Sequence, residues 1–196
     1  CTAAAKEAIR DILQDEDSLM VHGYMSNVGY SDVRQAVAEH LNRQYGTDFH
    51  ENNIIMTVGA AGGLNVILKT LLNPGDEVLT FAPYFTEYGN YVANYDGELV
   101  VVSPNTVDFQ PNLREFAEKI TAKTKAVIIN NPNNPTGQVI PPALLRKIAA
   151  LCQQKHVFLF VDECFLDLTQ DGDGLSLKSI LQENPNLLLL KAFTKS

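Results

Sequence analysis

Apolar residues are concentrated in short continuous runs, and longer segments with a helical spacing of apolar positions separate these runs. A continuous apolar run bounded by turn residues is typical of a strand that is buried on both faces. The sequence therefore predicts strands at residues 54–58, 77–81, 99–103, 126–130, 157–161 and 187–192.

Amphipathic segments precede and separate the predicted strands. In the first of them, Ala5, Ile9, Ile12 and Leu13 share one side of a helix. Because strands and helices alternate beyond residue 54, we expect an α/β fold, a three-layer α/β/α sandwich with a mostly parallel sheet. Ligands in such sheets bind beyond the carboxyl ends of the strands. Helices are predicted at residues 2–14, 31–45, 62–72, 85–95, 113–120 and 141–155.

Composition and charge narrow the classes of function. The chain has 196 residues, of which 45% are apolar and 19% charged, an ordinary balance for a globular protein. Its apolar runs are far too short to cross a membrane. The net charge of -8 argues against a nucleic-acid partner. Cys1, Cys152 and Cys164 have neither metal-ligand nor disulfide spacing, so we expect no metal site and a reducing, cytoplasmic location.

The ends of the first two predicted strands carry candidate binding groups. Gly59, Ala60 and Ala61 open a helix, where small residues and free amides suit a phosphate, although a tight turn explains them equally well. Residues 82–88 include aromatic side chains that could stack on a flat ring, although such side chains also pack in cores.

Polar groups follow the later strands. Residues 130–137 contain four Asn beside two Pro, and a buried Asn offers both donors and acceptors, although Pro and Gly also mark a plain turn. Asp162 and Glu163 end a buried strand, where a carboxylate is costly unless it is paired. Asp162 could hold a protonated ring nitrogen or a metal. Lys195 follows the last strand, where partial dehydration makes an amine more nucleophilic, although most lone lysines are solvated.

The order and placement of these groups resemble the fold-type I pyridoxal-phosphate enzymes of the class I/II aminotransferase family. The resemblance rests on residues 131–137, then on residues 161–163 and 193–195, and it covers essentially the whole chain. It implies an enzyme that uses pyridoxal 5'-phosphate (PLP) to move an amino group between an amino acid and a 2-oxo acid.

The resemblance implies three catalytic residues. Lys195 forms the Schiff base with PLP and then moves the proton at the substrate α-carbon. Asp162 lies against the pyridinium nitrogen and keeps it protonated. Asn134 donates to the phenolic oxygen of the cofactor, and the peptide bond from Asn134 to Pro135 is expected to be cis.

The resemblance also implies residues that bind the cofactor. Phe85 stacks on the ring, Ala60 and Ala61 offer backbone amides to the phosphate, and Thr194 adds a hydroxyl. Tyr24 reaches the phosphate of the neighbouring subunit, so a homodimer with shared active sites is expected.

Three residues depart from the pattern of the family. Phe165 stands where many members have a Tyr that bonds the phenolic oxygen, and Ala192 stands where a Ser or Thr often touches the phosphate. Gly59 has no hydroxyl to offer. We therefore expect the phosphate to depend mainly on backbone amides and on Thr194.

The resemblance divides the chain into two parts. Residues 1–45 are the helical lead-in and dimer-contact loop, and residues 46–196 are the large PLP-binding domain, incomplete at its C-terminus and without the small domain. The piece alone is expected to be inactive. Two alternatives remain open: a PLP-dependent lyase or decarboxylase on the same scaffold, and a non-catalytic sensor domain of a transcription regulator.

Overall fold

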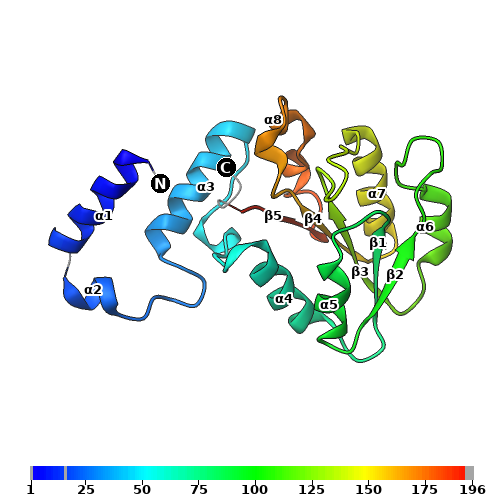
Figure 1. Ribbon diagram of the computed structural model, residues 1–196, viewed down its shortest axis with the longest axis horizontal. Helices are drawn as coiled ribbons and strands as arrows, with labels where there is room; N and C mark the ends of the chain where they lie inside the picture. Colours follow the sequence, from blue (N-terminus) through cyan, green and yellow to red (C-terminus); the bar gives the residue numbers. More distant parts are fainter. Residues whose placement is uncertain (1, 16, 193–196) are drawn as a thin grey trace. The chain divides into compact units, whose positions relative to one another are not determined.

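The computed structural model describes residues 2–15 and 17–192 and forms two compact units (Figure 1). The first unit is Cys1–His40 with Asp48–Met56, and the second is Leu41–Thr47 with Thr57–Ser196. Among the described residues, no helix is both long and apolar enough to cross a membrane.

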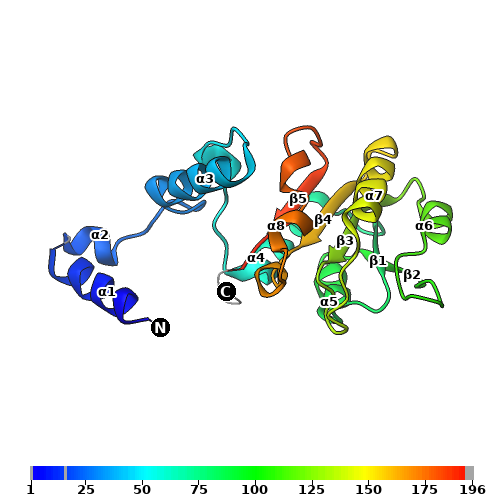
Figure 2. The ribbon, with the colours of Figure 1, turned by 90° about the horizontal axis from the view of Figure 1, so that it is seen from above.

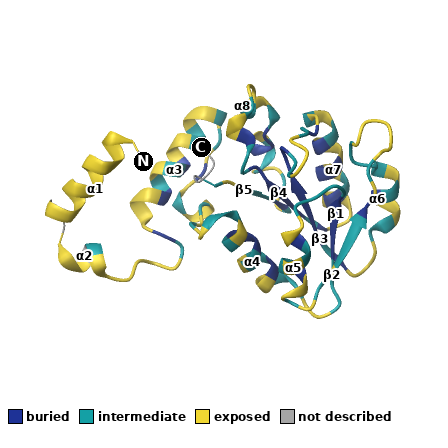
Figure 3. Cartoon of the chain, in the orientation of Figure 1, coloured by how far each residue is buried: buried dark blue, intermediate teal, exposed yellow. Residues whose placement is uncertain are grey.

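The first unit is helical. Helix α1 confirms the predicted amphipathic helix, and its apolar residues Ile9, Ile12 and Leu13 are exposed in the single chain (Figure 3). Helix α2 was not predicted, because it is only five residues long; the Asp17 side chain caps it by accepting from the amide of Leu19 at 3.1 Å. The helices are α1 (Ala3–Asp15), α2 (Ser18–His22) and α3 (Ser31–Tyr45), which continues into the second unit.

The second unit is built on a five-stranded parallel sheet of order β2-β1-β3-β4-β5. The sequence predicted each of these strands to within two residues. Their runs of Val, Ile, Leu and Phe are buried because helices cover both faces of the sheet. The strands are β1 (Glu77–Phe81), β2 (Glu98–Val102), β3 (Thr124–Asn130), β4 (Phe158–Asp162) and β5 (Leu187–Leu190).

Helices on the two faces of the sheet enclose two separate cores (Figures 1 and 2). Successive strand residues point to opposite faces, so Val78 packs with α4 and α5 whereas Leu79 packs with α6 and α7. The three-layer α/β/α prediction is confirmed. The helices are α4 (Gly59–Leu71), α5 (Glu87–Ala93), α6 (Leu113–Lys119), α7 (Pro142–Gln154) and the short α8 (Gly172–Leu175).

The predicted strand at residues 54–58 was wrong. A 3-10 turn at Glu51–Asn53 precedes it, and the chain then has no regular secondary structure until α4 begins at Gly59. Ile55 and Val58 are 63% and 94% exposed. An apolar run becomes a strand only when another strand satisfies its backbone groups, and no described strand pairs with this segment, whose Met56 amide donates to the carbonyl of Val28 at 3.0 Å instead.

Candidate active site

A cavity of about 290 Å³ opens at the carboxyl ends of the parallel strands. Sites for small molecules and cofactors have volumes of roughly 300–1,000 Å³, so the cavity is at the small end of that class. Its walls come from the first turns of α4, from α5 and the loop before it, and from the residues that end or follow β3, β4 and β5. It is lined by Gly59, Ala60, Ala61, Leu64, Phe85, Tyr88, Tyr91, Asn130, Asn134, Asp162, Cys164, Phe165 and Ala192.

Asp162 is the last residue of β4, and its buried carboxylate lies on the cavity wall. The hydroxyl of Tyr88 donates to Oδ2 at 2.9 Å, and the backbone amide of Cys164 donates to Oδ1 at 3.1 Å. A buried carboxylate without such donors would be costly. Each oxygen retains a second acceptor site, so the carboxylate can also accept from a ligand in the cavity.

The Asn-rich loop after β3 is held by its own side chains. Asn130 Oδ1 accepts from the amide of Asn134 at 2.5 Å, and Asn133 Nδ2 donates to the carbonyl of Pro83 at 2.7 Å. Asn131 Oδ1 accepts from the amide of Ile140 at 2.8 Å. These bonds place Asn134 on the cavity wall beside Asp162.

The predicted cis bond between Asn134 and Pro135 is confirmed. The bonds from Asn131 to Pro132 and from Ala82 to Pro83 are also cis, and the sequence analysis did not anticipate them.

Helix α4 begins at the cavity. Gly59 has a φ of 66°, a conformation that favours glycine, and it turns the chain into the helix. Ala60 and Ala61 occupy the first helical turn, where amides have no acceptor within their own helix. At Gly63 an added Cβ would lie 3.2 Å from Leu190 Cδ2, so this glycine lets α4 approach β5 closely. The helix therefore presents its positive end to the cavity.

Aromatic side chains form another wall. Phe85 and Tyr88 meet edge to face, with ring centroids 5.7 Å apart and an interplanar angle of 84°. Phe165, Ala192 and Gly59 also line the cavity, so all three positions named as departures from the family pattern face this space.

Glu163 is buried but does not line the cavity. Ser176 Oγ lies 2.9 Å from each carboxylate oxygen, and the amide of Leu177 donates to Oε1 at 3.3 Å. Burial raises the pKa of Glu163 above its ordinary value, although the hydrogen bond from Ser176 and the charge of Lys178 lower it in part. The two adjacent acids therefore leave β4 in different directions, as the alternation along a strand requires.

The structure brings five of the predicted site residues to one cavity: Ala60, Ala61, Phe85, Asn134 and Asp162.

Three predicted site residues are not among those that line the cavity. Thr194 and Lys195 lie outside the described residues, and the described chain reaches Ala192 on the cavity wall. Tyr24 belongs to the first unit, where its side chain is fully exposed.

Tyr88 and Tyr91 also line the cavity, but the sequence analysis assigned neither of them a role of its own. Their spacing offered a signal, since Tyr88 and Tyr91 lie three residues apart and so share one side of α5. The hydrogen bond from Tyr88 to Asp162 could not be predicted from the sequence, because the two residues are 74 positions apart.

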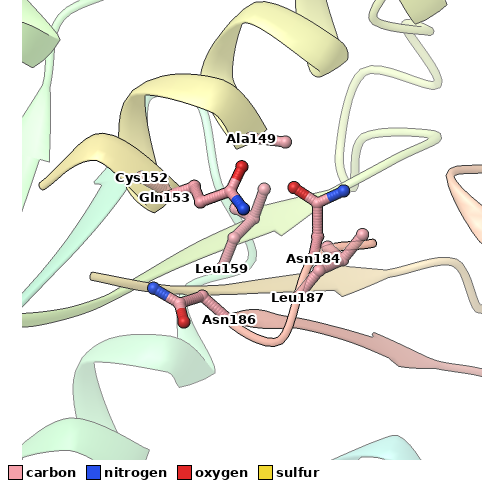
Figure 4. Close-up of a pocket in the computed structure, with 7 residues that line it drawn as sticks. All are labelled: Ala149, Cys152, Gln153, Leu159, Asn184, Asn186 and Leu187. Atoms are coloured by element: carbon pink, nitrogen blue, oxygen red, sulfur yellow. The ribbon is translucent and has the colours of Figure 1, made fainter. Parts of the chain in front are cut away.

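A second crevice lies near the amino ends of β4 and β5 (Figure 4). The side chain of Gln153 donates to the carbonyl of Glu183 at 3.5 Å, and that of Asn186 donates to the carbonyl of Val157 at 3.4 Å. The crevice has no volume for even a water-sized molecule, so we do not regard it as a binding site.

Known proteins resemble the chain in sequence. The family model for "Aminotransferase class I and II" matches residues 1–196. A probable aspartate/prephenate aminotransferase of Aquifex aeolicus is 34% identical over 176 residues, which cover 88% of this chain and 45% of the relative. An aspartate aminotransferase of Sulfurisphaera tokodaii is 35% identical over 164 residues, which cover 82% of this chain and 40% of the relative.

Solved structures resemble it in fold. An aminotransferase of Eubacterium rectale superimposes with a TM-score of 0.92 at 34% identity, over 100% of this chain and 50% of that one. A double mutant of the Thermus thermophilus aspartate aminotransferase gives a TM-score of 0.86 at 30% identity, over 97% of this chain and 48% of that one.

The chain spans about half the length of the relatives that it matches. The family model nevertheless covers all of its residues, and the aspartate aminotransferase-like fold agrees with that match. The resemblance inferred from residues 131–137, 161–163 and 193–195 is therefore confirmed, and the chain belongs to the class I and II aminotransferase family.

Proposed function

We propose that the whole protein is a PLP-dependent aminotransferase that moves an amino group between an amino acid and a 2-oxo acid. The observation that carries the proposal is the buried Asp162 carboxylate on the wall of a cavity at the carboxyl ends of parallel strands. Such an acid, held by Tyr88 and still able to accept, suits a cationic group in the cavity.

The residues present fit PLP. The cofactor has a phosphate, a flat ring and a basic ring nitrogen, and the cavity offers a counterpart for each. The amino end of α4 favours an anion, the face of Phe85 suits a ring, and Asp162 suits a protonated nitrogen. When bound, PLP withdraws electrons from the substrate and so makes the proton on the α-carbon acidic.

Asp162 and Asn134 would hold the ring of the cofactor. Asp162 keeps the ring nitrogen protonated, because its carboxylate stabilises the positive charge. Asn134 donates to the phenolic oxygen, and the bond from its amide to Asn130 fixes the loop that carries it. Phe85 covers one face of the ring and excludes water from it.

The phosphate would lie at the amino end of α4. The amides of Ala60 and Ala61 donate to it, and the hydroxyl of Thr194 adds a donor. Tyr24 of a second copy completes the phosphate site, so the enzyme is a homodimer with shared active sites. The exposed Tyr24 side chain and the uncovered apolar side of α1 support a surface that another copy covers.

Lys195 would supply the amine that attaches the cofactor covalently. The same amine would accept the proton from the α-carbon of the substrate and deliver it to the cofactor carbon that keeps the amino group. Lys191 is less suited to this role, because it does not line the cavity and its ammonium group pairs with Asp167.

We assign residues 1–45 to the lead-in and dimer contact and residues 46–196 to the large PLP-binding domain. We place the protein in the cytoplasm, which is consistent with the reduced thiol of Cys152. Aspartate is the first substrate to test, because the names of both relatives include it. Those relatives are aminotransferases, which favours transamination over a lyase or a sensor.

The test is a half-reaction of the whole protein loaded with PLP. On addition of L-aspartate without a 2-oxo acid, we expect the absorbance of the bound cofactor to change to that of pyridoxamine phosphate, with one equivalent of 2-oxo acid released. If a panel of amino acids leaves the spectrum unchanged, or yields an amine and CO₂ instead, the proposal is wrong.

A further inference from the structure

Tyr88 contacts two of the residues that line the cavity, Phe85 and Asp162. Its side chain has no exposed surface and packs with Leu64, Val92 and Phe160 in the core beneath α4 and α5. Its hydroxyl donates to Asp162, and the edge of its ring meets Phe85. One side chain therefore contacts two of the three residues that the proposed function places against the PLP ring, Asp162 and Phe85.

Tyr88 is the donor in its hydrogen bond to Asp162. Burial, together with the charge of Asp162, raises the pKa of Tyr88 far above its ordinary value, so the phenol keeps its proton. The phenol is therefore the donor to the carboxylate at neutral pH.

The orientation of Asp162 is set from two sides. Tyr88 engages Oδ2, and the amide of Cys164 engages Oδ1, so rotation of the carboxylate would break at least one of the two bonds. Hydrogen bonds to charged groups are among the stronger ones in proteins, and one end of this bond is anchored in a packed core.

We propose that Tyr88 is a positioning residue that holds the Asp162 carboxylate in the orientation in which it meets the ring nitrogen of PLP. This inference rests on the proposed function. It differs from a role in packing alone, because a packing residue would affect every ligand of the cavity equally, whereas Tyr88 should matter only for ligands that have the ring nitrogen.

The test compares two ligands in the whole protein freed of cofactor. One is PLP, and the other is an analogue with carbon in place of the ring nitrogen. We expect Tyr88→Phe to weaken PLP binding by about tenfold, the loss typical of a hydrogen bond to a charged group, and to weaken analogue binding by less than about twofold. In an Asp162→Asn background, the effect of Tyr88→Phe on PLP should fall below about threefold, because the two residues act through one contact.

Tyr95→Phe is the matched control. The Tyr95 hydroxyl donates to Asn65 at 3.2 Å, and its ring packs against the same core, but it does not line the cavity. This variant should bind both ligands as the wild type does. Tyr88→Met, which fills the apolar site without a donor, provides a second measurement if Tyr88→Phe does not fold.

Each outcome of these binding measurements either supports or overturns the positioning role of Tyr88. A loss confined to PLP supports the inference. An equal loss for PLP and the analogue, a full loss that persists in the Asp162→Asn background, or no loss at all overturns it. If the wild type fails to bind PLP, the proposed function itself is wrong, and this outcome is distinct from an equal loss of both ligands.

Discussion

Asp162 and Glu163 are adjacent and both buried, yet they lie in different regions of the molecule. Asp162 faces the cavity, with one donor on each oxygen and space in front of it. Glu163 turns to the segment before β5, where Ser176 and Leu177 donate to it inside packed protein. Asp162 is therefore placed to contact a ligand, whereas Glu163 connects two parts of the fold.

The largest expected effect is that of Asp162→Ala. Removing the carboxylate leaves the ring nitrogen of PLP without a counter-charge, so turnover of the whole enzyme should fall by roughly 10²–10³-fold, as for loss of one preorganised electrostatic group. Steady-state kinetics and PLP titration measure it. Near-normal turnover would show that the cavity acid is not a catalytic residue.

Glu163→Gln should have a much smaller effect on the cofactor. The side chain lies outside the cavity, so PLP affinity should change by less than about twofold, as for sites without shared contacts. A loss as large as that of Asp162→Ala would remove the distinction between the two acids.

The same variant should alter the pH dependence of stability. Because burial raises the pKa of Glu163 in the folded state, the unfolded chain releases this proton first as pH rises above about 4.3. The wild type therefore loses free energy of unfolding, relative to Glu163→Gln, as pH rises through the raised pKa. Denaturant unfolding between pH 4 and 8 measures the difference, and a constant or opposite difference would contradict the account.

The sequence was most informative where local pattern and topology agree. Apolar runs such as residues 77–81 are strands because helices cover both faces of the sheet, and the parallel order brings Asp162 and Asn134 to the same edge. Their positions could be predicted because the carboxyl ends of neighbouring parallel strands lie together.

The sequence was least informative where contacts with distant segments determine the local structure, and where an element is very short. Residues 54–58 have the composition of a strand, but no described strand pairs with them. Helices α2 and α8 are too short to show the periodic spacing of apolar residues that predicts a helix. The contact between Tyr88 and Asp162 depends on how α5 packs against the sheet, and spacing along the chain contains no information about it.

The central claim is that the cavity holds PLP on Lys195, with Asp162 at the ring nitrogen. Borohydride reduction of the PLP-loaded whole protein, followed by peptide mapping, tests it most directly, since reduction fixes the cofactor on the lysine that carries it. We expect the label on Lys195. A label on Lys191, which is paired with Asp167, or on any other lysine would contradict it.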